Sequence, residues 1–284
     1  MSSQIWRVLY PIIVQEARAM DRPRRKTCFS DQLIVGMFFW MVLHDRTQEW
    51  ACHRSSYHAV FRPRVLPSPS QFSRRLRSPR CLELLKRVER AAAPCSTSPC
   101  CYLDARPLAV GTCSKDPDAK PGRVYGGFAR GYRVHSLLDE KETVIAWKLE
   151  PMNVAEVTVA PELLRQAPAG SSVLADSNYD RAPLYEIAAE HGATLLAKPR
   201  VNAGKGHRPQ SAARLASIAQ WQADPQTYAS RRTHVERAQA HQSSFAGGLQ
   251  PLPAWVRRLH RVKRWVAAKL VINHVRLQQK EHAA

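Results

Sequence analysis

Apolar positions in the first third of the chain recur with a helical period. Over 3–19 they lie three or four residues apart, which predicts a helix that kinks or restarts at Pro11. Ser30 precedes a long apolar stretch and is placed to cap a helix over 31–43. That stretch is too short to cross a bilayer, so it indicates a buried helix and no membrane partner. A further helix is predicted over 44–61.

A turn rich in proline and serine at 63–70 is followed by a short basic helix. The helix is predicted from Gln71 to about Arg77, with a serine as its cap. Arg74, Arg75 and Arg77 give this helix a basic face. A capped basic helix after a tight turn is typical of the reading helix of a helix-turn-helix, which would bring these arginines to DNA. An ordinary solvent-exposed basic helix is the alternative.

The pattern changes from helices to strands after a linker at 91–99 that contains small residues, serine and proline. We therefore predict a helical, helix-turn-helix-like DNA-binding region at 1–97 and an α/β domain at 98–284. Strands are predicted over 101–110, 130–138, 143–149, 173–176 and 193–198, helices over 154–167 and 182–190, and a loop over 115–127. This order matches the mixed sheet, flanked by helices, of the ribonuclease H-like fold.

Two of the predicted strands carry a carboxylate directly after a short apolar run. Short apolar runs lead into Asp104 and into Asp176, and turn residues follow Asp176. Carboxylates at strand tips bind hard cations well, because the sheet holds their oxygens in place. A third carboxylate, Glu236, lies in a basic segment. Taken singly, the aspartates could be turn formers or helix caps, and Glu236 could pair with Arg232 on a helix surface.

The charge of the chain indicates a polyanionic partner. Its 284 residues include 43 Lys and Arg against 23 Asp and Glu, a formal net charge of +20. This excess favours nucleic acid through electrostatic steering and through release of counterions from phosphates. Ribosomal and membrane-surface proteins are the alternatives, although a membrane-surface protein more typically carries one basic amphipathic helix.

Seven cysteines without a repeated Cys-x-x-Cys pair argue against a disulfide framework or a zinc module. No secretory signal is expected.

Several short segments in the second region form an ordered set. They are Leu103-Asp104 with Pro107-Leu108, the basic segment 130–135, and the segments 151–156, 174–180 and 232–237. In their order and spacing they resemble the DDE-class transposases of bacterial insertion sequences, over roughly 66–277. The segments that contain Asp104 and Asp176 resemble the motifs of the first and second carboxylates. The segment that contains Glu236 resembles the terminal glutamate helix.

The resemblance implies a catalytic site and a set of partners. Asp104, Asp176 and Glu236 would hold two Mg²⁺ (or Mn²⁺) ions, with Asp104 bridging both. Such ions activate the attacking water or 3′-hydroxyl and stabilise the leaving oxygen. The partner would be double-stranded DNA, as element terminal repeats and as target. The protein would act as a homo-oligomer on this DNA, in the cytoplasm and associated with the nucleoid.

Further basic residues are placed to contact DNA phosphates. Arg232 precedes Glu236 by one helical turn, so it would lie beside the metals. A basic helix with an apolar side is predicted over 255–265, and its proposed DNA contacts are Arg257, Arg258, Arg261 and Lys263. A solvent-exposed helix face is the alternative for this cluster.

Two features differ from the family's pattern around the glutamate. One residue more than expected separates Tyr228 from Arg232, and Ser243 stands where the pattern has lysine. Two further functions therefore stay open beside insertion-element transposition. One is a catalytically inactive, transposase-derived DNA-binding protein. The other is a structure-selective ribonuclease H-like nuclease, which would cut branched DNA without strand transfer.

Overall fold

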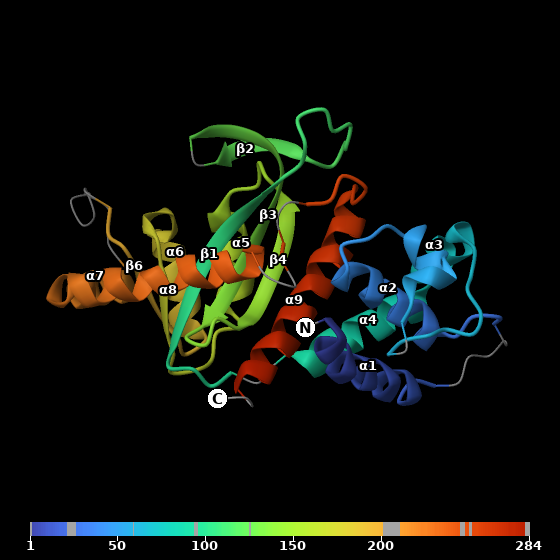
Figure 1. Ribbon diagram of the computed structural model, residues 1–284. Helices are drawn as coiled ribbons and strands as arrows, with labels where there is room; N and C mark the ends of the chain where they lie inside the picture. Colours follow the sequence, from blue (N-terminus) through green and yellow to red (C-terminus); the bar gives the residue numbers. More distant parts are fainter. Residues whose placement is uncertain are drawn as a thin grey trace. The chain divides into compact units, whose positions relative to one another are not determined.

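The computed structural model describes residues 2–21, 27–58, 60–93, 96–124, 126–200, 211–244, 248–249 and 252–281. The chain divides into two units (Figure 1). Unit 1 comprises Met1–Pro94, Ser244–Leu249 and Val262–Ala284, and unit 2 comprises Cys95–Ser243 and Gln250–Arg261. Of the helices in the described ranges, none is long and apolar enough to cross a membrane. Part of the predicted linker, at Pro94 and Cys95, lies outside the described residues.

Unit 1 is built from helices. They are α1 (Ser2–Arg18), α2 (Asp31–Leu43), α3 (Pro69–Leu76), α4 (Pro79–Ala92) and most of α9 (Leu259–Glu281). From Ile34 to Leu43 every residue of α2 is buried, as its apolar composition predicted. Ser30 caps α2 by accepting a hydrogen bond from the Leu33 amide, which confirms the predicted cap.

Three expectations for unit 1 need correction. α1 continues through Pro11 as one helix. α3 begins earlier than predicted, at Pro69, because Ser68 and Gln71 form a capping box. The helix predicted over 44–61 is wrong, since the described residues of this segment form only the short 3₁₀ turns Trp50–Cys52 and Arg54–Ser56. Side chains compete there for backbone carbonyls. Trp40 Nε1 donates to Ser56 O at 2.9 Å, and Ser56 Oγ donates to Trp50 O at 2.6 Å.

The C-terminal helix packs with unit 1 from Val262 onward. Lys269 on α9 is fully buried, and its Nζ lies 2.7 Å from Asp45 Oδ1 and over the ring of Trp265. Gln279 Nε2 also donates to Gln4 O at 2.9 Å. The division predicted at residues 97 and 98 placed this whole helix in the second domain. The difference arises because the buried side of α9 meets partners that are distant in the sequence.

Unit 2 is a mixed α/β unit around a six-stranded sheet. Its strands are β1 (Cys100–Ala109), β2 (Lys120–Val124), β3 (Gly127–Asp139), β4 (Val144–Pro151), β5 (Ser172–Ala175) and β6 (Thr194–Ala197). The order is β2-β3-β1-β5-β6. The long strand β3 pairs with β2 over residues 127–131 and with β4 over residues 132–138. β5 is parallel to both β1 and β6, and the other pairs are antiparallel. The strands predicted over 130–138 and 143–149 are confirmed as β3 and β4 and form an antiparallel hairpin, whereas β2 lies inside the segment predicted as a loop.

Helices flank this sheet, as a ribonuclease H-like core requires (Figure 1). α5 (Glu156–Leu164) and α6 (Ala182–Glu190) cover one face, over a core that includes Leu103, Val173 and Ala175. Side chains alternate along a strand, so Cys100 and Asp104 of β1 point to the opposite face. There the Arg231 guanidinium of α8 (Pro225–Ser244) opposes the rise that burial gives to the pKa of the Cys100 thiol. α7 (Ala212–Ala223) precedes α8 and packs beside β6.

Candidate active site

The register of two parallel strands brings Asp104 and Asp176 together. In the parallel ladder between β1 and β5 the last paired residues are Leu103 and Ala175, and each aspartate comes one position after this pair. Because neighbouring strands lie about 4.8 Å apart, the two carboxylates emerge side by side from the sheet. β1 continues past this point and still pairs with β3, where Ser136 is opposite Asp104. β5 ends, and Asp176 caps the short turn Ser177–Tyr179 by accepting from the Asn178 amide at 2.8 Å.

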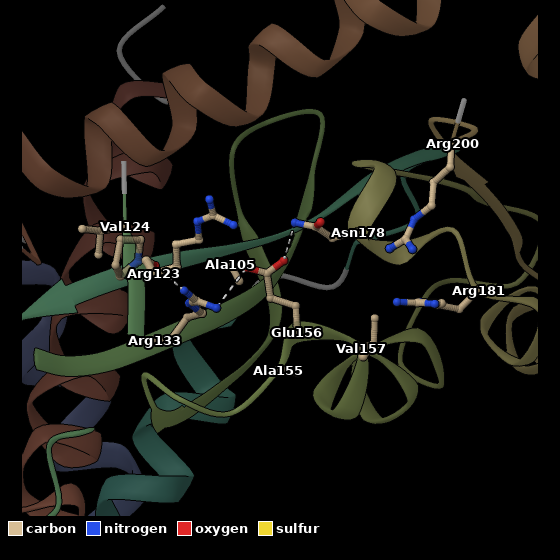
Figure 2. Close-up of a pocket in the computed structure, with 11 residues that line it drawn as sticks. Ala105, Arg123, Val124, Arg133, Ala155, Glu156, Val157, Asn178, Arg181 and Arg200 are labelled. Carbon is tan, nitrogen blue, oxygen red and sulfur yellow. Dashed lines mark hydrogen bonds and ion pairs between the residues drawn. The ribbon is translucent and has the colours of Figure 1, made fainter. Parts of the chain in front are cut away.

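A third carboxylate, Glu156, lies beside this pair, and sequence reasoning did not select it. It is the first residue of α5. Asn178 Nδ2 lies 3.2 Å from Asp176 Oδ2 and 3.4 Å from Glu156 Oε2, so this amide links the two acids. Arg133 of β3 forms an ion pair with Glu156, with NH1 3.3 Å from Oε1 (Figure 2). The available signal was that Glu156 comes after a strand and a turn, at the start of a helix.

The three carboxylates influence one another electrostatically. Burial raises the pKa of Glu156, the Arg133 guanidinium opposes that shift, and the charges of Asp176 and Asp104 add to it. Tyr179 is buried and its pKa is raised well above the ordinary value, first by burial and then by Glu156, Asp104 and Asp176. Its hydroxyl has no hydrogen-bond partner among the described residues. A cation at this position would relieve the repulsion between the acids.

A cleft of about 500 Å³ opens beside Glu156 and Asn178 (Figure 2). Its apolar lining comes from β1, β2 and the start of α5. Its polar lining consists of Glu156, Asn178, Arg123, Arg133, Arg181 and Arg200. Four guanidinium groups against one carboxylate make the cleft strongly cationic. Asn178, which contacts Asp176, thus borders a surface that attracts anions.

Glu236, the expected third catalytic residue, is exposed to solvent on α8. Its neighbours Val235 and Ala238 are buried. Within the described ranges, no group of three or more His, Cys, Asp or Glu side chains is arranged to hold a metal ion. The structure thus brings Asp104 and Asp176 together, and the membership of Glu236 in the site stays a prediction. The oxygens of the aspartates and of Asn178 are hard ligands of the kind that Mg²⁺ and Mn²⁺ prefer.

The predicted DNA contacts on α3 differ in their surroundings. Arg75 is engaged within unit 1, where its NH2 lies 2.7 Å from Asp31 Oδ1 and 3.1 Å from Phe29 O. Arg74 and Arg77 at the end of α3 are exposed. Arg75 thus fixes α3 against the start of α2, and Arg74 and Arg77 are the two that solvent reaches most freely.

The predicted basic helix over 255–265 begins only at Leu259, so Arg257 and Arg258 precede it. Arg258 has a positive φ of 73°, which stops the helix from extending backwards. Its amide donates to Asp116 Oδ2 at 3.0 Å, and the Leu259 amide donates to Asp118 Oδ2 at 3.0 Å.

Asp116 and Asp118, in the loop before β2, thus cap α9. Arg258 NH1 also lies 3.6 Å from Asp118 Oδ1. Arg261 and Lys263 lie on the helix itself and are exposed, whereas Arg232 on α8 is partly buried.

The fold is that expected of a DDE domain: a mixed sheet flanked by helices, with two aspartates at equivalent positions on neighbouring parallel strands. The family model of the transposase DDE domain matches residues 102–278. This match covers more than half of the chain, and the chain belongs to that family. No curated protein matches it.

Proposed function

We propose that this protein is the transposase of an insertion element, which cleaves DNA strands at the element ends and joins them to target DNA. The observation that carries the proposal is the register that places Asp104 beside Asp176. Two carboxylates in this relation, next to a cationic cleft, suit phosphodiester chemistry, because one side holds cations and the other holds phosphates.

The site takes two divalent ions, Mg²⁺ or Mn²⁺, on Asp104 and Asp176. When bound, such ions lower the pKa of the attacking hydroxyl or water and stabilise the leaving oxygen. A further carboxylate comes from a helix, either Glu236 of α8 or Glu156 of α5. Asn178 holds the Asp176 side chain in place through its hydrogen bond, and Arg133 does the same for Glu156. The protein residues thus orient the ligands before DNA arrives.

Unit 1 supplies recognition of the element ends in this proposal. Arg74 and Arg77 of α3 are exposed and extend from a capped helix. The guanidinium group of arginine can donate two hydrogen bonds to the edge of a guanine, and it also binds phosphates. Arg232, Arg261 and Lys263 would contact phosphates along the same double-stranded DNA. The protein acts on its two element ends as a homo-oligomer.

The test is a cleavage assay on a plasmid that carries the inverted repeats flanking the gene. We expect nicks or breaks at the repeat ends with Mg²⁺ or Mn²⁺, none with EDTA, and joined products when target DNA is added. Cleavage of branched DNA without preference for the repeats would contradict the proposal and indicate a structure-selective nuclease. Binding to the repeats without cleavage in either metal would indicate an inactive DNA-binding protein.

A further inference from the structure

The cleft beside the carboxylates presents cationic groups from separate segments of unit 2. Arg123 and Arg133 come from β2 and β3, and Arg181 and Arg200 come from the segments around α6 and after β6. Only Arg133 has a carboxylate partner within the cleft lining, Glu156. The other guanidinium groups therefore leave a net positive charge in the cleft.

Arg181 and Arg200 point into the same part of the cleft, next to Asn178 (Figure 2). Arg200 is held there, because its Nε donates to Ser177 O at 3.0 Å and its amide donates to Asp180 Oδ2 at 3.1 Å. Arg181 is exposed, and within the described ranges no ion pair neutralises it. Two guanidinium groups directed at one place repel each other, and an anion between them removes that cost.

Two helices begin at this cleft and add to its attraction for anions. Ala155 and Arg181 are the N-cap residues of α5 and α6, and both line the cleft. Neither residue makes a side-chain capping hydrogen bond. The first amides of both helices thus lack a side-chain acceptor at the cap, and these helix ends carry partial positive charge.

An exposed aromatic ring is the cross-strand neighbour of one residue that lines the cleft. Phe128 on β3 is 80% exposed, unusually high for a large apolar side chain. It is the direct cross-strand partner of Arg123 on β2, so the two side chains stand on the same face of the hairpin. Arg123 itself lines the cleft. A solvent-exposed ring beside guanidinium groups matches the way proteins bind unpaired nucleotides, with bases stacked on rings and phosphates on cations.

We infer that this cleft binds an unpaired segment of DNA strand, with its phosphates on Arg123, Arg181 and Arg200 and a base stacked on Phe128. Duplex DNA does not satisfy the same site, because its bases are already stacked and cannot reach the ring. The inference rests on the proposed function for its biological setting, because the cleft lies near the proposed site of strand cleavage. It adds to that proposal that the cleft binds DNA as an unpaired strand and not as a duplex.

The test measures binding of a labelled oligothymidine in EDTA, over a range of salt concentrations, to the full-length protein. Phe128→Ala is expected to weaken binding about five- to a hundredfold and to leave the salt dependence unchanged, because a stacking contact carries no charge. Arg181→Gln is expected to reduce the slope of log K against log salt by about 0.7, the value for one phosphate contact on a single strand. Arg181→Lys should restore that slope.

Leu215→Ala and Arg165→Gln are the matched controls, because they remove an exposed apolar and an exposed basic side chain elsewhere in unit 2. Phe128→Ala and Arg181→Gln variants that fold and bind like these controls would overturn the inference. A reduced slope for Arg181→Gln with no effect of Phe128→Ala would also overturn it, since the cleft would then bind phosphate alone. The assay contains no metal and involves no cleavage, so its outcome is independent of whether the protein is an active transposase.

Discussion

Asp104→Asn and Asp176→Asn are each expected to lower the rate of DNA cleavage by about a thousandfold or more. An amide occupies the same space as the carboxylate but lacks its charge, and a metal ion held in this way contributes several kcal/mol to the transition state. DNA binding should stay intact or become tighter, because a negative charge near the phosphates is removed. Cleavage rates and affinities of both variants would be measured on the same repeat-containing DNA.

Glu190→Gln is the matched control for these variants. Glu190 is an exposed carboxylate at the end of α6, away from the carboxylate pair. This variant should cleave like the parent protein. Cleavage by Asp104→Asn or Asp176→Asn at the parent rate would contradict the metal role. Weakened DNA binding would instead show that the carboxylate supports the structure.

Asp180→Asn is expected to destabilise unit 2 by about 3–5 kcal/mol at neutral pH, the usual cost of breaking a buried ion pair. The Asp180 side chain is completely buried, and Arg214 contacts both of its oxygens at 2.8 and 3.0 Å. Tyr185 Oη donates to Oδ1 at 3.1 Å, and the Arg200 amide donates to Oδ2. An asparagine leaves the Arg214 charge uncompensated and loses one acceptor. Urea unfolding of parent and variant measures the difference.

The effect of Asp180→Asn should depend on pH. Burial alone would raise the pKa of Asp180, but the hydrogen bonds and charge of Arg214 and the Arg200 amide outweigh it and lower the pKa below 3.8. The ionised group therefore stabilises the folded state above its unfolded pKa, and this contribution is lost as the pH falls through the folded pKa. Parent and variant should converge in acid. Glu186→Gln, an exposed substitution on α6, should leave stability unchanged at every pH. Equal stability of Asp180→Asn and parent at pH 7 would contradict the role given to this ion pair.

Local sequence patterns predicted the carboxylate pair because its geometry depends on strands alone. Asp104 and Asp176 each follow a short apolar run, and the parallel pairing of those strands then aligns them. Glu156 could not be selected in this way. It joins the site through Arg133 on β3 and Asn178 after β5, which are distant from it in the sequence. A first-turn glutamate is also common on helices that bind nothing.

The basic residues show the same limit. Arg74 and Arg75 are neighbours in the sequence, yet Arg75 is paired with Asp31 and Arg74 is exposed. Composition can predict that a chain with a net charge of +20 binds a polyanion, but it cannot say which arginines are already used within the fold. The prediction of a helix over 44–61 was wrong for a related reason. The hydrogen bond from Trp40 to Ser56 holds that segment in place, and the spacing of apolar residues along the chain does not reveal it.

The central claim is that Asp104 and Asp176 bind the divalent ions of a strand-cleavage site, and iron-directed cleavage of the polypeptide tests it most directly. Fe²⁺ occupies oxygen-rich Mg²⁺ and Mn²⁺ sites, and with ascorbate and peroxide it cuts the backbone next to its ligands. We expect cuts near residues 104 and 176 that excess Mg²⁺ suppresses and that the Asp104→Asn and Asp176→Asn substitutions abolish. An additional cut near 156 or near 236 would identify the third carboxylate. Mg²⁺-sensitive cuts that avoid both 104 and 176 would contradict the account.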